Sequence, residues 1–341
     1  MNNTSPPCTT LFPKEEKVGY RQNNQIIIFS ATSVTIELSL LFPFPILFYS
    51  LPFDDDFILI VSSENPSSLI LWNIQLNQED TLLKFESPIL SFIYSGAFSC
   101  VVTDTSTFIV RSRPLVIHHS IPTQAPLTAI SLIQSPNDNN HCVFAYGDDM
   151  RVTSVNILTI PSSAPPVTFE AHKAPIRAVA LSNNGKYIAT VSNKGTIIRL
   201  WTIDGKLINE SRRGLTPATI MHMSFSPCSE YLCVSSNHFT SHIFKVEPMH
   251  SKSHTSNHDS NSWLNFLPKA DITVSIQDTK TFSSFILAGG SVLCSVTDKG
   301  VCEIYDIDQE SNKCNFKSRI TIPKIASVAS AKISCSGKES S

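Results

Sequence analysis

The sequence predicts an all-β fold, and specifically a seven-bladed β-propeller of the WD-repeat type. Alternation with a period of two residues, which is typical of strands, dominates the chain, and residues 196–202 are a clear example. The chain also repeats itself at an offset of 44 residues, where 176–182 matches 220–226 and Tyr187 matches Tyr231. Propeller blades of four strands have repeats of about 40–45 residues. The repeat therefore has the size of one blade.

A series of similar strand-ending turns gives the number of blades. Most of these turns are separated by 40 to 45 residues. They lie at 62–64, 103–104, 147–148, 192–193, 236–237 and 297–298, with a fainter one at 31–32. Seven turns at this spacing predict seven blades arranged around one axis.

The ends of the propeller follow from composition. We expect a flexible N-terminus at 1–20, the propeller at 21–310, and a C-terminal segment at 311–341 whose end is disordered. The uncharged run at 38–53 contains three prolines and is shorter than the roughly 20 residues of a membrane helix, so we expect core strands joined by a proline turn. The nine cysteines include no C-x-x-C pair, which favours buried reduced thiols in a cytosolic protein.

The best repeat also places individual strands. In the fifth blade we expect strands at 176–181, 187–192, 196–202 and 206–213, and in the sixth at 220–226, 231–236 and 240–246. A polar, low-complexity segment at 247–262 then lengthens the spacing by about 17 residues. We expect it to be a long rim loop between the third and fourth strands of the sixth blade.

The charge distribution points to a bound anion. Residues 171–213 contain eight Lys and Arg against two acidic residues, in a chain whose net charge is −2. Arg212 and Arg213, followed by Gly214, end this basic stretch. Neighbouring side chains in a strand point to opposite faces. We therefore expect the two arginines to serve two anion sites at the rim.

Other classes of function find little support. The chain has no G-x-S-x-G, P-loop or H-E-x-x-H motif, so we expect no enzyme and no cofactor. The basic stretch lacks the interleaved aromatic residues that favour nucleic-acid binding. His250, His254 and His258 lie in a Ser/Asn-rich segment, where we expect solvated side chains and no metal site.

Five segments together carry a resemblance to a known family. They are residues 171–177, 189–199, 211–214, 225–227 and 234–244. They resemble the PROPPINs, a family of β-propellers that bind polyphosphoinositides. The match is dense over 170–244, and residues 63–72 and 85–93 look similar to earlier blades of that family.

The resemblance implies two phosphoinositide sites on the rim and a loop that enters the bilayer. The first site would use His172, Thr190, Ser192, Gly195, Thr196, Arg199 and Arg212. The second would use Arg213, Gly214, Ser236, Thr240 and His242. In the family the long loop of the sixth blade dips into the membrane, which here would depend on Trp263, Leu264 and Phe266.

These residue types suit phosphate recognition on chemical grounds alone. Arg offers a planar fork of donors, Ser and Thr offer short hydroxyls, and Gly195 lets backbone N–H groups approach an anion. We expect His172 and His242 to become more cationic beside phosphate, so that mildly acidic pH tightens binding. A basic contact near an anionic surface is worth about 1 kcal/mol. Two sites and an inserted loop would together give avidity on a membrane.

Two positions depart from the family pattern. Ser211 replaces the apolar residue that usually precedes the arginines, and Phe239 stands where the first site has Gly195. We expect the bulky Phe239 side chain to crowd the second site. Structural alternatives also stay open. The two arginines could be a solvated strand end, and His172 could be a WD-type histidine that bonds a neighbouring blade. The Ser and Thr residues could form ordinary turns, and the three apolar residues after the long loop could belong to a core strand.

The resemblance, together with the basic stretch, implies a peripheral membrane adaptor that binds phosphatidylinositol 3-phosphate, with the 3,5-bisphosphate as a further ligand. By resemblance its partners would be proteins of autophagosome formation or endolysosomal traffic. We expect a monomer in the cytoplasm, recruited to the phagophore assembly site, endosome or vacuole/lysosome. The alternative is a WD-repeat scaffold for protein–protein contacts without lipid binding.

Overall fold

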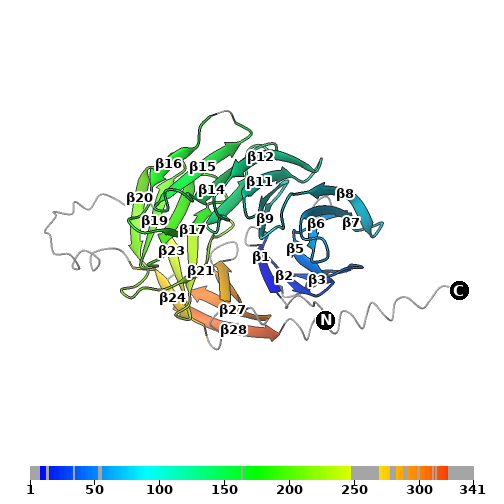
Figure 1. The fold of residues 1–341 in the computed structure, drawn as a ribbon. Helices are drawn as coiled ribbons and strands as arrows, with labels where there is room; N and C mark the ends of the chain where they lie inside the picture. The colour runs from blue at the N-terminus through cyan, green and yellow to red at the C-terminus, as the bar shows by residue number, and fades with distance from the viewer. Residues whose placement is uncertain are drawn as a thin grey trace.

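The computed structural model confirms the seven-bladed, all-β propeller. It describes residues 8–12, 15–33, 35–52, 56–162, 164–246, 269–276, 282–286, 291–297, 300–308, 311 and 313–321. Seven antiparallel sheets of four strands follow one another around a ring (Figure 1). In the described residues no helix is long and apolar enough to cross a membrane.

The first four blades span the N-terminal half of the chain. Blade 1 consists of β1 (Cys8–Phe12), β2 (Lys17–Gln22), β3 (Gln25–Ser30) and β4 (Ile36–Leu41). Blade 2 consists of β5 (Ile46–Tyr49), β6 (Phe57–Ser62), β7 (Ser68–Asn73) and β8 (Gln78–Lys84). Blade 3 consists of β9 (Ser91–Ser95), β10 (Phe98–Val102), β11 (Ser106–Arg111) and β12 (Val116–Pro122). Blade 4 consists of β13 (Ile130–Gln134), β14 (Cys142–Gly147), β15 (Ser154–Ile160) and β16 (Val167–Glu170).

The remaining three blades complete the ring. Blade 5 consists of β17 (Ile176–Leu181), β18 (Tyr187–Ser192), β19 (Ile197–Thr202) and β20 (Leu207–Arg212). Blade 6 consists of β21 (Ile220–Phe225), β22 (Tyr231–Ser236), β23 (Thr240–Lys245) and β24 (Ile272–Ser275). Blade 7 consists of β25 (Phe282–Ile286), β26 (Val292–Thr297), β27 (Val301–Asp308) and β28 (Lys313–Thr321).

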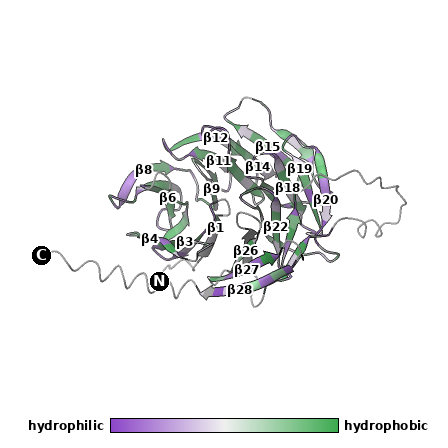
Figure 2. Ribbon diagram, turned by 180° about the vertical axis from the view of Figure 1, so that it is seen from behind, coloured by the Kyte–Doolittle hydropathy of each residue, from purple (hydrophilic) through white to green (hydrophobic). Residues whose placement is uncertain are grey.

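The core lies between blades. Seven clusters of buried apolar side chains each join two neighbouring blades, because the two faces of every sheet are covered by the next sheets around the ring. Outer strands are more hydrophilic, as β8 and β28 show (Figure 2). Each sheet contains only consecutive strands. The ring therefore closes by packing, where Tyr20 and Phe29 of blade 1 meet Val296 and Ile304 of blade 7.

Blade 1 corrects the expected boundaries. Residues 8–12 and 17–22 form β1 and β2, where a flexible N-terminus was predicted, and β28 continues past the predicted end at 310. The faint turn at 31–32 follows the third strand of its blade, whereas the other six turns follow the second. The matching turn of blade 1 lies at Asn23, which has a φ of 53°. The prediction placed the turn of blade 1 after its third strand instead of its second. It therefore began the propeller at residue 21, whereas β1 begins at Cys8.

The proline-rich run forms two strands joined by a turn, as predicted, but the first of them is the half-buried outer strand of blade 1 and not a core strand. It forms β4 and β5, and Phe42 and Phe44 in the turn between them pack on the Trp72 ring at centroid distances of 5.6 and 5.5 Å. Among the described cysteines all seven side chains are free thiols, and five of them are buried. This agrees with the expected reduced state.

Candidate anion-binding site

The candidate site lies where blade 5 meets blade 6, beside the turn that joins β18 to β19. Gly195 in this turn has a φ of 63°, and its N–H donates to the Ser192 carbonyl at 2.9 Å. A Cβ on Gly195 would lie 1.9 Å from the Ala218 carbonyl oxygen. Glycine is therefore required here both by the left-handed backbone and by the close passage of the chain entering blade 6.

Thr190 is the centre of a buried hydrogen-bond network. Its Oγ1 is 3.0 Å from His172 Nε2 and accepts a hydrogen bond from Trp201 Nε1 at 3.0 Å. His172 lies between β16 and β17, so the network ties blade 4 to blade 5. Thr190 is fully buried and His172 nearly so. These contacts favour the structural, WD-type interpretation of both residues over direct contact with a ligand.

His172 is held neutral by its surroundings. Burial, and secondly the nearby Arg199 guanidinium, lower the pKa of His172 to about 4. Arg199 Nη1 approaches His172 Nδ1 at 3.4 Å, and since a guanidinium can only donate, Nδ1 is the acceptor and Nε2 carries the proton. In the unliganded protein His172 therefore stays uncharged at mildly acidic pH, and an increase in its positive charge beside bound phosphate stays a prediction.

Arg199 already has an anionic partner within the protein. Its Nε lies 2.5 Å from Glu210 Oε1, and its Nη1 donates to the Ala171 carbonyl at 2.7 Å. Arg199 and Glu210 face each other across β19 and β20 as a cross-strand pair. Their side chains are 19 % and 22 % exposed, so the ion pair is shielded from water and Glu210 partly neutralises the first predicted site. Glu210 is one of the two acidic residues of the basic stretch 171–213, and its place beside Arg199 was not predicted.

The paired arginines line one pocket instead of facing opposite sides. Arg212 is the last residue of β20, and Arg213 follows the strand, so strand alternation does not apply to the pair. Backbone N–H of Arg213 donates to Thr196 O at 2.8 Å. The Arg213 guanidinium donates from Nε to Gly195 O at 2.5 Å and from Nη2 to Thr216 O at 2.7 Å. Burial lowers the pKa of Arg213, although a guanidinium stays charged at neutral pH.

This pocket between the blades is cationic. Its volume is about 250 Å³, and no acidic side chain is among the described residues that line it. The lining residues are Arg212, Arg213, Gly214, Leu215, His242, Lys269, Ala270 and Thr273. Three permanent cations around one hollow, with a hydroxyl and an imidazole, are the donors that a phosphate group requires.

His242 connects the pocket to the hydroxyl groups of the second predicted site. Its Nε2 is 3.1 Å from Thr240 Oγ1, which in turn is 3.2 Å from Ser236 Oγ. Its Nδ1 is 3.2 Å from Thr273 Oγ1 on the neighbouring strand. Burial, then Arg213 and His238, lower the pKa of His242 to about 4. The structure thus brings together all five residues predicted for the second site, with His242 neutral in the unliganded protein.

Phe239 does not crowd this pocket as expected. Its φ of 60° matches that of Gly195 in the preceding blade, and its side chain is 37 % exposed and is not part of the pocket lining. The left-handed backbone turns the side chain outward. A substitution that the sequence presents as an obstruction therefore leaves the hollow open.

Two pocket residues escaped the sequence analysis. Lys269 and Thr273 follow the polar segment of blade 6, and an isolated bridge pairs Lys269 with Arg212. Their place follows from the pairing of β24 with β23, in which Thr273 lies opposite His242. The predicted membrane residues Trp263, Leu264 and Phe266, the loop at 247–262 and the three histidines within it lie outside the described residues.

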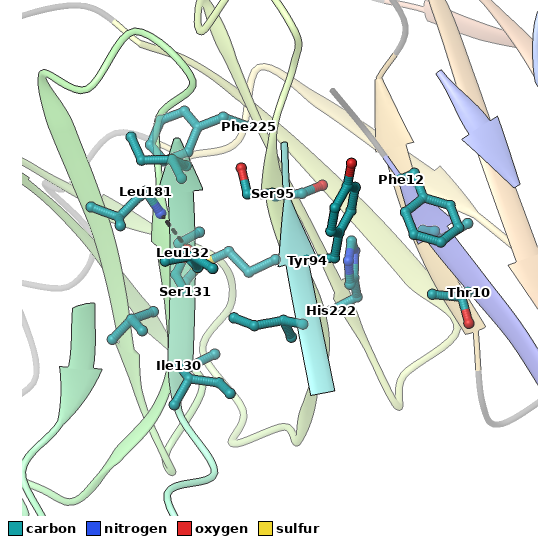
Figure 3. Close-up of a pocket in the computed structure, with 18 of the residues that line it drawn as sticks. Thr10, Phe12, Tyr94, Ser95, Ile130, Ser131, Leu132, Leu181, His222 and Phe225 are labelled. Atoms are coloured by element: carbon teal, nitrogen blue, oxygen red, sulfur yellow. Dashed lines mark hydrogen bonds between the residues drawn. The ribbon is translucent and has the colours of Figure 1, made fainter. Parts of the chain in front are cut away.

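A larger cavity lies elsewhere, between the innermost strands of the propeller. It has a volume of about 470 Å³ and is lined mainly by the innermost strands β1, β9, β13, β17 and β21. Figure 3 shows Tyr94, Leu132, His222 and Phe225 among the residues that line it, with Ser131 Oγ accepting from the Leu181 N–H at 3.0 Å. Its lining mixes apolar and polar side chains, and it lacks the convergent cations of the rim pocket. The described residues also contain no group of side chains suited to hold a metal ion.

A family model supplies the decisive comparison. The model described as PROPPIN matches residues 47–287, which is more than half of the chain. The chain belongs to the PROPPIN family. The match runs from blade 2 into blade 7 and includes the whole of the blade 5–6 junction.

Curated relatives agree with the PROPPIN assignment. "SVP1-like protein 2" of Candida glabrata is 40 % identical over 207 residues, which is 53 % of this chain and 46 % of the relative. "Autophagy-related protein 18" of Aspergillus oryzae is 28 % identical over 206 residues, covering 53 % of this chain and 49 % of the relative. Mouse "WD repeat domain phosphoinositide-interacting protein 2" is 29 % identical over 206 residues, covering 59 % and 45 %. The matches to these relatives span about half the length of each of them.

Solved structures confirm the fold of this PROPPIN. Kluyveromyces lactis Hsv2 superposes with a TM-score of 0.76 at 18 % identity, over 93 % of this chain and 99 % of the Hsv2 chain. Kluyveromyces marxianus Hsv2 gives a TM-score of 0.74 at 18 % identity, with 93 % and 99 % covered. The arrangement of seven blades is thus shared along nearly the whole chain.

Proposed function

We propose that this PROPPIN is a peripheral membrane adaptor that binds phosphoinositide headgroups at the junction of blades 5 and 6. The observation that carries the proposal is the cationic pocket formed by Arg212, Arg213 and Lys269, with the polar side chains of His242 and Thr273. Phosphatidylinositol 3-phosphate is the first candidate ligand and the 3,5-bisphosphate the second. The printed name of the mouse relative, a phosphoinositide-interacting protein, supports this class of ligand.

The two predicted sites differ in how they would meet a phosphate. At the first site, Glu210 forms an ion pair with Arg199, and His172 and Thr190 are hydrogen-bonded to each other in the blade 4–5 network. At the second, the hydrogen bonds of Arg213 go to carbonyl groups, which hold the guanidinium in place without cancelling its charge. We infer that the second site is the stronger one, because its pocket also contains Arg212, which was predicted for the first site, and that the rest of the first site contributes through avidity on a membrane.

The cellular role is proposed from the same family membership. We propose a cytoplasmic protein that is recruited to the phagophore assembly site, endosome or vacuole/lysosome, and that brings partner proteins of autophagy or membrane traffic with it. Several relatives are named autophagy-related proteins, which supports this class of partner. We further propose that it acts as a monomer and by binding, without catalysis.

Liposome co-sedimentation tests the proposed function. Vesicles of neutral lipid with and without phosphatidylinositol 3-phosphate would be compared for the wild type and for Arg212→Thr/Arg213→Thr. We expect binding that depends on the phosphoinositide and is lost in the double variant. Because Arg213 also holds backbone carbonyls, Arg213→Lys serves as a charge-preserving control and thermal unfolding checks the fold of each variant. A folded wild type that ignores every phosphoinositide would leave the protein-scaffold alternative.

A further inference from the structure

Phe239 occupies a costly backbone conformation at an exposed turn. The turns at Gly195 and Phe239 are equivalent in blades 5 and 6, with φ of 63° and 60° and N–H···O bonds to Ser192 and Ser236 of 2.9 and 3.2 Å. Left-handed backbone is unfavourable for any residue that has a Cβ and free of this cost for glycine. An aromatic side chain held there, 37 % exposed, calls for a role outside the core.

Leu215 is a second exposed apolar side chain close by. It follows Gly214 in a tight loop that is held by the hydrogen bond from Arg213 Nη2 to Thr216 O. Leu215 lines the cationic pocket and yet is 63 % exposed. Its position is therefore at the mouth of the pocket, with most of its side chain in solvent.

Phe239 lies in the same blade as the pocket residue His242. It directly precedes Thr240, the first residue of β23, and His242 is three residues after Phe239. With a rise of about 3.3 Å per residue, the two backbone positions are roughly 10 Å apart along the strand. One exposed apolar side chain, Leu215, therefore lies at the pocket itself, and a second, Phe239, precedes a strand that contributes to its lining.

We propose that Leu215 and Phe239 form a membrane-contact surface that enters the boundary between headgroups and acyl chains, while the pocket beside them holds a phosphorylated headgroup. The occupant is an anionic phospholipid bilayer, since it offers a phosphate and an apolar phase within the 5–10 Å depth that interfacial elements reach. A dissolved anion would satisfy the pocket alone and leave both apolar side chains in water. This surface rests on the proposed function and is made of residues that lie outside 247–262 in the sequence.

The backbone conformation at Phe239 allows a variant that removes the aromatic ring without an expected loss of stability. Phe239→Gly removes the aromatic ring and also relieves the left-handed conformation, so its thermal stability should equal or exceed that of the wild type. We expect at least about fivefold weaker partition onto vesicles containing phosphatidylinositol 3-phosphate, which is about 1 kcal/mol. Leu215→Ser should show a similar loss. Leu76→Ser, which changes a leucine that is 66 % exposed beside β8 of blade 2, is the matched control and should bind as the wild type does.

A water-soluble short-chain phosphatidylinositol 3-phosphate separates this surface from the pocket. Titration with it should give the same affinity for the wild type and Phe239→Gly, because Phe239 is not part of the pocket lining. Leu215→Ser also changes the lining and is therefore compared on vesicles only. The surface is refuted if both variants partition onto vesicles as the wild type does, or if Phe239→Gly loses the soluble lipid to the same extent as vesicles. A wild type that binds neither probe would instead overturn the proposed function itself, and the surface with it.

Direct insertion can be measured with Phe239→Trp. Vesicles with brominated acyl chains should quench the added tryptophan emission relative to the wild type, which contributes the background of its three native tryptophans. Absence of additional quenching in vesicle-bound Phe239→Trp would contradict the proposed insertion.

Discussion

At the scale of single residues, the charge of the site depends on which groups of the protein each arginine already contacts. Arg199 is paired with Glu210 at 2.5 Å, whereas Arg213 is held by two carbonyl oxygens. A carboxylate cancels a guanidinium charge in a shielded position, and a carbonyl does not. Two arginines only 14 residues apart in the sequence therefore present very different fields to an arriving phosphate.

Removing the Glu210 charge should strengthen anion binding. Glu210→Gln keeps a side-chain oxygen that can accept from Arg199 Nε but removes the negative charge beside the first site. We expect a three- to tenfold gain in affinity for short-chain phosphatidylinositol 3-phosphate by calorimetric titration, which corresponds to about 0.7–1.4 kcal/mol. Glu37→Gln is the matched control, since it breaks the Lys17–Glu37 ion pair of blade 1 and changes the net charge equally. Weaker binding by Glu210→Gln would show that the carboxylate positions Arg199 for the ligand.

The two buried histidines should make the unliganded protein sensitive to acid. Their folded-state pKa values of about 4 lie below the usual 6.5, so the unfolded chain takes up protons that the folded protein refuses. Stability is fully present above pH 6.5 and is lost as pH falls toward 4. Each pH unit in this window costs about 1.4 kcal/mol per histidine.

Urea unfolding at pH 7 and pH 5 measures this effect. Carboxylates titrate over part of the same range, so the comparison is between the wild type and His242→Gln. The variant should lose about 2 kcal/mol less stability between the two pH values, since it lacks one of the two histidines. Equal losses would mean that His242 is protonated in the folded protein.

At the scale of elements, the residues at the two junctions of blade 5 do two tasks. Thr190, His172 and Trp201 join blade 4 to blade 5, and Gly195 lets the next connection pass within contact distance. Beside this rigid scaffold the end of β20 and the start of β24 line the pocket. Residues that look like one motif in the sequence thus divide into those that support the site and those that line it.

Replacing Thr190 should therefore affect stability before binding. Thr190→Val is nearly isosteric, but it leaves Trp201 Nε1 and His172 Nε2 without their shared oxygen in a buried position. An unsatisfied buried donor costs about 1–3 kcal/mol, so chemical denaturation should show a loss of at least that size. Affinity of the folded variant for soluble lipid should change less than twofold. A fully stable variant that fails to bind would assign Thr190 to the ligand instead.

At the scale of the whole molecule, the sequence predicts the ring better than it predicts the site. Seven blades were predicted from a repeat of 44 residues and from strand alternation. Both patterns arise because side chains of each blade are buried against the neighbouring blades. Blade 1 was set wrongly because its first strand is short and follows a polar terminus. Glu210, Lys269 and Thr273 were missed because cross-strand register and the return from a long insertion decide which side chains meet. The outward position of Phe239 depends on one backbone angle that no residue pattern reports.

The most direct test of the central claim is calorimetric titration of short-chain phosphatidylinositol 3-phosphate into the wild type and Arg213→Thr. The claim is that the rim pocket at the blade 5–6 junction recognises the phosphorylated headgroup itself, apart from any contact with a bilayer. We predict saturable binding by the wild type, and loss of its stronger binding event in a variant that thermal unfolding shows to be folded. An unchanged isotherm for folded Arg213→Thr, or no saturable binding by the wild type, would contradict the account.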